Sequence, residues 1–174
     1  SMGGYTGLAF AEMYPDMMKG LLMFFSSAAA DTKQKKINRN RAIKLVERNK
    51  SSFVRNSIPL LFTPENASKY KSTVDKLISR ANAMGVQSII ASLGGIRDRN
   101  DREIVLKFAP FPVAYILGEL DPILPIDEIK KQAKLPKDGS LTIIPKIGHM
   151  GFIESKKQSY LAVKDFISKT YCLK

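Results

Sequence analysis

Cysteine and histidine are almost absent from this sequence. Its 174 residues contain one cysteine, Cys172, and one histidine, His149. A lone cysteine cannot form an internal disulfide, which fits a reducing compartment, so we expect a cytoplasmic protein. We expect no metal and no cofactor. Any reaction that needs an imidazole base must use His149, because no other imidazole exists in the chain.

Long apolar segments are also missing. No hydrophobic run approaches the roughly 20 residues that cross a bilayer, and the N-terminus lacks the pattern of a signal peptide. We therefore expect no membrane partner. Hydrophobic residues make up 44% and charged residues 25% of the chain, which is typical of a globular protein. The length allows one domain with a small appended subdomain.

Acidic residues are few compared with basic ones. The chain has 16 Asp and Glu against 28 Lys and Arg, so its formal net charge is +12. The densest basic segment covers residues 31–50, where only Asp31 and Glu47 are acidic. A solvated helix face explains such a segment, and the alternative is a non-catalytic module that binds anions or nucleic acid. No recognisable nucleic-acid-binding motif accompanies it, so nucleic acid is not the expected partner.

Three short, mainly apolar runs predict strands. The first is bounded by turn-forming residues and suits a fully buried strand, and the second is also expected to be buried. The three runs are Leu21–Phe25, Val113–Leu117 and Leu141–Ile144. Helices are predicted before, between and after them, at residues 5–14, 126–133 and 155–171. Strands that alternate with helices favour a parallel α/β sheet, here with three strands and flanking helices.

The middle of the chain carries no strand signal and predicts an all-helical insertion. A helix capped by Asp31 or Thr32 is expected to end near Asn49, with a shorter helix after it. The clearest helical stripe consists of Tyr70, Val74, Leu77, Ile78 and Ala81. A further helix is expected to end at Gly94-Gly95, and a short one is expected after it.

These patterns divide the chain into two regions. Residues 1–25 and 110–174 are assigned to the sheet core, and residues 26–109 to a helical cap or lid. The fold class is therefore α/β.

One acid and one base follow the second and third predicted strands. His149 lies between glycines that free the backbone to turn, although a lone loop histidine is more often structural. Asp121 precedes a proline, where a turn aspartate is the simpler interpretation. Its neighbours Leu120, Ile123 and Leu124 are apolar, however, and a carboxylate among apolar side chains needs a partner to offset desolvation. An imidazole is one such partner.

The chain opens with Ser1-Met2-Gly3-Gly4, followed by a predicted helix. This stretch resembles the second half of the nucleophile elbow of the α/β-hydrolase family, G-x-S-x-G, at which a strand turns into a helix. The family's chain order of Ser, Asp and His is matched by Ser1, Asp121 and His149. The resemblance extends over the whole chain and implies an incomplete α/β-hydrolase sheet, with residues 26–109 as the inserted cap.

The resemblance implies a role for each of these residues. Ser1 would attack a carbonyl, His149 would accept its proton, and Asp121 would orient the imidazole. The backbone N–H of Met2 would donate to the oxyanion, with Gly3 completing the elbow. The substrate would be a small, apolar carboxylic ester. C–C bond hydrolases and cofactor-free peroxidases share the same triad, and ester hydrolysis is the commonest activity among them.

A set of apolar residues in the predicted cap suggests an acyl pocket, and core packing explains them as well. The set is Phe53, Leu60, Leu61 and Phe62.

Part of the family's pattern lies outside this sequence. The first glycine of the elbow, the strand before it and the loop with the second oxyanion donor are not present. We therefore expect this chain to be the C-terminal part of such an enzyme, with little or no activity alone. Its first strand would be an open edge, and open hydrophobic edges recruit partners, so we expect a homo-oligomer.

Two alternatives concern Ser1. An N-terminal serine can use its own α-amino group as the base, but the enzymes that do so rest on stacked antiparallel sheets rather than an α/β sheet. Ser1-Met2 also matches a serine left by cloning before a start methionine, in which case the serine would not be encoded.

Overall fold

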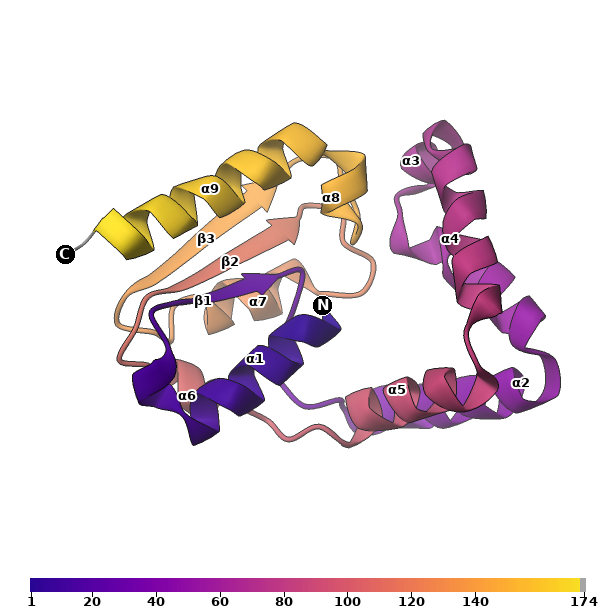
Figure 1. The fold of residues 1–174 in the computed structure, drawn as a ribbon, viewed down its shortest axis with the longest axis horizontal. Helices are drawn as coiled ribbons and strands as arrows, with labels where there is room; N and C mark the ends of the chain where they lie inside the picture. Colours follow the sequence, from indigo (N-terminus) through magenta and orange to yellow (C-terminus); the bar gives the residue numbers. More distant parts are fainter. Residues whose placement is uncertain (173–174) are drawn as a thin grey trace. The chain divides into compact units, whose positions relative to one another are not determined.

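The computed structural model describes residues 1–172, which form two compact units (Figure 1). One unit combines residues 1–29 with the chain from residue 101 onward, and the other covers residues 30–100. The cap role assigned to residues 26–109 stays a prediction. Among the described helices, none has the length and apolar character needed to cross a membrane.

The first unit is built on three parallel strands. They are β1 (Leu21–Phe24), β2 (Val113–Gly118) and β3 (Gly139–Ile144). The order in the sheet is β1-β2-β3, and all three arrows point the same way in Figure 1. The predicted three-stranded parallel sheet is confirmed.

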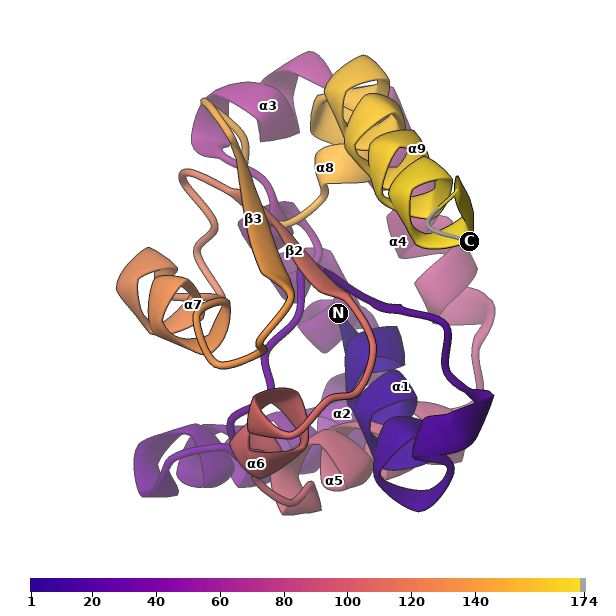
Figure 2. The same cartoon turned by 90° about the vertical axis from the view of Figure 1, so that its left-hand side faces the viewer.

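Helices cover both faces of this sheet, and Figure 2 shows α7 and α9 on opposite sides of it. The helices of this unit are α1 (Met2–Met13), the 3-10 turn η1 (Pro15–Met17), α6 (Glu103–Lys107), α7 (Ile126–Gln132), α8 (Gly151–Glu154) and α9 (Lys156–Cys172). Met23 and Tyr115 point into a core shared with α1, α6 and α7. Ile116 and Ile144 point into a second core shared with α9. The alternation of side chains along each strand produces these two layers.

The second unit contains helices only. They are α2 (Lys33–Ser57), the 3-10 turn η2 (Pro59–Leu61), α3 (Pro64–Lys69), α4 (Lys71–Ala83) and α5 (Val86–Asp98). Val46 and Val54 of α2 form its core with Ile89 and Leu93 of α5. Within the predicted stripe of α4, Val74 is buried and Ile78 packs against that core.

One predicted helix end in this unit is confirmed and another is wrong. The break expected near Asn49 is present: Asn49 has the non-helical φ of −155° and divides α2 into two helical segments, and its side-chain oxygen accepts a hydrogen bond from the Ser52 N–H at 2.9 Å. The stop expected at Gly94-Gly95 does not occur, because α5 runs through both glycines. Packing of Leu93 against α2 outweighs the low helix propensity of glycine.

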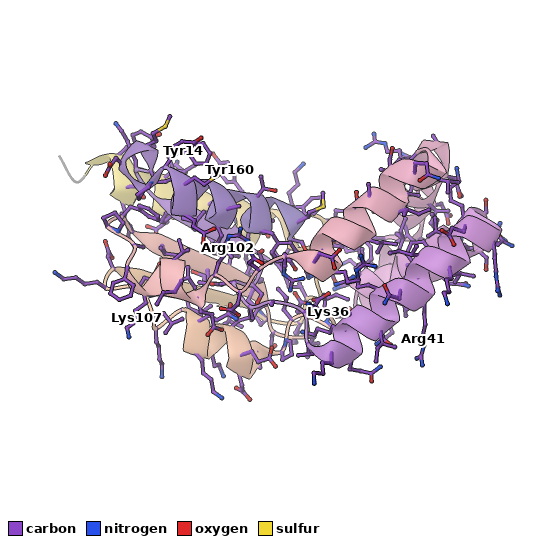
Figure 3. All side chains as sticks on the ribbon, turned by 90° about the horizontal axis from the view of Figure 1, so that it is seen from below. Tyr14, Lys36, Arg41, Arg102, Lys107 and Tyr160 are labelled. Carbon is purple, nitrogen blue, oxygen red and sulfur yellow. The ribbon has the colours of Figure 1, made fainter. Side chains whose placement is uncertain are left out.

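The basic segment 31–50 lies mainly on α2. Thr32 caps this helix by accepting a hydrogen bond from the Lys35 N–H. Buried Asp31 pairs with Arg39 at 3.1 Å and with Arg99 at 2.8 Å. Lys36 and Arg41 are exposed, and Figure 3 shows their side chains on the outside of the helix. Most of the segment is thus a solvated helix face.

Candidate active site

His149 and Asp121 meet at the carboxyl ends of β2 and β3. His149 Nδ1 lies 2.8 Å from Asp121 Oδ2, and the two side chains are 7% and 0% exposed. The other carboxylate oxygen, Asp121 Oδ1, accepts hydrogen bonds from the N–H groups of Ile123 and Leu124 at 2.8 and 3.0 Å. With Nδ1–H donating to the carboxylate, Nε2 of the imidazole carries the lone pair and can act as a base.

Backbone hydrogen bonds hold the two turns together. The Leu120 N–H donates to the Ile147 carbonyl at 2.9 Å, which joins the loop that contains Asp121 to the loop that contains His149. Gly118 allows this approach. A Cβ atom there would overlap the carbonyl oxygen of Gly148 and lie 2.6 Å from that of Ile147. The glycine that ends β2 is therefore required by the close contact between the loop of Asp121 and the loop of His149.

Phe25 packs beside the imidazole. Its ring lies edge-on to His149 with the ring centroids 5.9 Å apart, and only 2% of the residue is exposed. The sequence predicts Phe25 as the last residue of the first strand. Instead, β1 ends at Phe24 and Phe25 has φ +48°, a left-handed conformation that costs free energy for a bulky residue.

Ser1 lies at the same edge of the sheet. Its α-amino group donates to the carbonyl of Phe24 at 2.9 Å, and its own carbonyl accepts from the hydroxyl of buried Ser26 at 2.7 Å. Burial lowers the pKa of the α-amino group, and the negative charge of Asp121 partly opposes this shift. Ser1 is thus anchored at the tip of β1, beside Phe25 and within the field of Asp121.

Met2 and Gly3 form the first turn of α1 and are exposed. The Gly4 N–H donates to the carbonyl of Ser1 at 3.0 Å, which begins the hydrogen bonding of this helix. The first N–H groups of a helix have no intrahelical acceptor, and the helix dipole favours negative charge there. The start of α1 is therefore suited to bind an oxyanion.

The four predicted pocket residues lie in the second unit. Phe53 packs against the core of that unit, and Phe62 is buried with 3% exposed. Leu61 is half-buried, whereas Leu60 is 68% exposed. Core packing therefore accounts for Phe53, and the role of the set in substrate binding stays a prediction.

The sequence reasoning missed Glu154. This carboxylate is 7% exposed and accepts hydrogen bonds from the N–H groups of Gly148 and Met150, the two neighbours of His149. An acid in an otherwise apolar stretch shortly after His149 was the available signal. Within residues 1–172, no group of three or more His, Cys, Asp or Glu side chains is placed to hold a metal ion.

The sheet, its flanking helices and the two loops define part of an α/β-hydrolase fold, and solved structures of α/β-hydrolases match the chain. An esterase from Thermogutta terrifontis superposes with a TM-score of 0.89 at 26% identity, covering 98% of this chain and 63% of that chain. An enol-lactonase from Burkholderia xenovorans gives 0.85 at 16% identity, covering 97% and 63%. An α/β-hydrolase from a Medee basin deep-sea metagenome library gives 0.81 at 19% identity, covering 95% and 62%.

Two consequences follow from these matches. The chain spans about 63% of the length of the esterase, so the fold is a partial one. The neighbours are esterases and other hydrolases, which does not favour a nucleic-acid-binding or anion-binding module. No protein-family model and no curated protein matches the sequence.

Proposed function

We propose that the intact protein is a serine hydrolase that cleaves small, apolar carboxylic esters, with Ser1 as nucleophile, His149 as base and Asp121 as the orienting acid. The buried hydrogen bond of 2.8 Å between His149 and Asp121, at the sheet edge where Ser1 is anchored, carries this proposal. The likeness to esterases supports the hydrolase class.

In the first half of the reaction, Ser1 Oγ attacks the ester carbonyl carbon while Nε2 of His149 takes the hydroxyl proton. A C–O bond forms and the carbonyl electron pair moves to oxygen. When the tetrahedral intermediate collapses, the bond to the alcohol breaks and His149 returns the proton to the leaving alkoxide. Asp121 keeps the proton on Nδ1 throughout and stabilises the imidazolium that forms.

In the second half, His149 takes a proton from water as the water oxygen attacks the acyl carbon of acyl-Ser1. Collapse of the second tetrahedral intermediate breaks the bond to Ser1 Oγ, which regains the proton from His149. The products are a carboxylic acid and the free enzyme. No electrons are exchanged with a cofactor, so this chemistry is complete with water and ester.

The oxyanion of each intermediate would lie at the start of α1, facing the N–H of Met2. Removal of one oxyanion donor lowers the rate by about 10² to 10³-fold in serine hydrolases of this kind. Since this chain is proposed to supply only the donor of Met2, we expect the 174 residues alone to have little activity.

We also propose that residues 26–109 act as the helical cap of the enzyme. Phe53, Leu60, Leu61 and Phe62 are proposed as its acyl pocket, and Leu60 is exposed and Leu61 half-buried. We also propose a cytoplasmic location, which rests only on the single cysteine.

A fluorophosphonate probe tests the nucleophile, because it reacts with an activated serine hydroxyl. We expect the probe to label the intact protein at Ser1, and the Ser1→Ala and His149→Ala variants to remain unlabelled. Labelling of a different residue, or undiminished labelling of Ser1→Ala, would refute the assignment. Turnover of short p-nitrophenyl esters distinguishes an esterase from a C–C bond hydrolase or a peroxidase with the same three residues.

We further propose that the 174-residue chain self-associates through the face that contains β1 and α1. Within the part of the chain that the structure describes, β1 pairs only with β2, and α1 exposes Met2, Phe10 and Met13 by 50%, 38% and 63%. Apolar side chains beside an open strand edge favour pairing with a second copy. Light scattering should give a mass that rises with concentration, and Met13→Lys should lower it. A constant monomer mass at high concentration would refute this proposal.

A further inference from the structure

Glu154 holds the backbone on both sides of His149. Its Oε1 accepts hydrogen bonds from the N–H of Gly148 at 3.1 Å and from the N–H of Met150 at 3.0 Å. Its Oε2 lies 3.0 Å from the same Gly148 nitrogen. The carboxylate therefore binds the backbone on both sides of the histidine.

The short helix α8 fixes Glu154 in this position. Met150 is the N-cap residue of α8, and the Glu154 N–H donates to the carbonyl of Met150 at 2.9 Å. The side chain also binds the N–H of the N-cap residue, as the acid of a capping box does, although Glu154 lies one position later in the helix than that acid. Because only 7% of Glu154 is exposed, these bonds replace water around the carboxylate.

The ring of Phe25 also contacts the loop of His149. Phe25 lies edge-on to the His149 ring, and a Cβ atom on Gly151 would overlap the Phe25 ring. Gly151 therefore lets the loop of His149 lie directly on Phe25. The loop is held by Glu154 through its amides and by Phe25 through its packing.

The bond to Asp121 alone does not determine the orientation of the imidazole. It fixes one ring atom, Nδ1, whereas the direction of Nε2 also depends on where the Cα atom of His149 lies. The two amides bound by Glu154 flank that Cα atom. Without their acceptor, one buried and one part-buried N–H group would lose hydrogen bonds, and the loop would shift to regain them.

We propose that Glu154 is a positioning residue for His149, which keeps Nε2 directed at the nucleophile by binding the amides of Gly148 and Met150. This inference rests on the proposed function of His149 as a base. The bonds of Glu154 go to backbone N–H groups and Nδ1 is bound by Asp121, so the proposed role of Glu154 is to position the histidine rather than to transfer a proton.

Nuclear magnetic resonance of the 174-residue chain tests this inference directly, since His149 is its only histidine and gives a single set of imidazole signals. In the unmodified chain we expect a protected Nδ1–H signal. In Glu154→Ala we expect that proton to exchange with water about tenfold faster, from the loss of buried hydrogen bonds. Glu154→Gln keeps one acceptor oxygen and the shape of the side chain, so it should give an intermediate rate.

Glu119→Gln is the matched control. Glu119 is exposed and also binds a loop amide, accepting from the Lys146 N–H at 3.0 Å, but that amide lies farther from His149. We expect this variant to leave the Nδ1–H exchange unchanged. If Glu154→Ala and Glu154→Gln both leave it unchanged while exchange of the Gly148 and Met150 amides rises, the positioning role is wrong.

Kinetics of the intact protein separates this inference from the proposed function. Glu154→Ala should lower kcat by about 10²-fold, as expected for a misplaced base, with KM little changed. Glu154→Gln should recover part of that loss. If Ser1 is not labelled by the probe but the Nδ1–H signal still depends on Glu154, the proposed function fails and the structural coupling stands. If Ser1 is labelled equally fast in Glu154→Ala, the positioning role fails and the hydrolase assignment stands.

Discussion

The two units of this chain use different physical means to define their structures. Residues 30–100 form helices held by an apolar core of Val46, Val54, Ile89 and Leu93. That unit also buries Asp31 between two arginines, but the sheet unit gathers three buried polar side chains at the carboxyl ends of its strands, where hydrogen bonds hold Asp121, His149 and Glu154. Apolar packing tolerates substitution of similar volume, whereas a buried polar cluster requires each partner in place. Chemistry is therefore expected in the sheet unit.

Replacing the orienting acid should have the largest effect on activity. Asp121→Asn can still accept from the Ile123 and Leu124 amides, but its other side-chain group no longer holds the required tautomer of His149. We expect ester hydrolysis by the intact protein to fall by about 10⁴-fold. Steady-state rates measure this, with circular dichroism to verify folding. Activity within tenfold of the original would remove Asp121 from the mechanism.

The two units should respond oppositely to the same glycine-to-alanine change. Gly118→Ala places a Cβ atom against the carbonyls of Ile147 and Gly148, so we expect about 3 kcal/mol of destabilisation from overpacking. Gly95→Ala is the matched control in α5, where a Cβ atom meets nothing within 4 Å. It should stabilise the chain by about 1 kcal/mol through helix propensity. Urea unfolding of both variants gives the two values, and equal effects would contradict the comparison.

Alkaline pH should act on the sheet unit through Tyr115. Burial raises the pKa of its hydroxyl well above the usual range, with a smaller contribution from Glu103. The unfolded chain then loses this proton near pH 10 while the folded chain retains it, so stability is full below pH 10 and falls above it. The slope is about 1.4 kcal/mol for each pH unit. Tyr115→Phe should flatten the dependence of the unfolding free energy on pH above pH 10. Tyr160→Phe, at an exposed tyrosine, should not.

The smallest effect is expected at the start of α2. Thr32→Ala removes the side-chain oxygen that accepts from the Lys35 N–H at 3.2 Å, and loss of such a cap costs about 1 kcal/mol. Thr32→Ser keeps the oxygen and should retain most of the stability. Because the change lies in the helical unit, the Nδ1–H signal of His149 should not move. A shift of that signal in Thr32→Ala would show that the two units are coupled.

Local patterns predicted most of the elements. The apolar runs of β1 and β2 are typical of buried strands, β3 is a strand whose residues are mostly exposed or half-buried, and the stripe of α4 has helical spacing. The boundary at Phe25 and the passage of α5 through Gly94-Gly95 were not predictable, because contacts with His149 and with α2 decide them. Local propensity cannot include such distant contacts.

For the site, the sequence alone determined the candidates and their order. A single histidine, an aspartate after a buried strand and a serine-glycine turn leave few other choices for acyl-transfer chemistry. Only the tertiary structure decided that Asp121 lies 2.8 Å from His149, that Gly118 must lack a side chain, and that Glu154 binds the backbone of the histidine loop. Each of these features depends on two turns meeting at the edge of a sheet. Such a meeting is set by strand pairing and core packing between segments far apart in the chain.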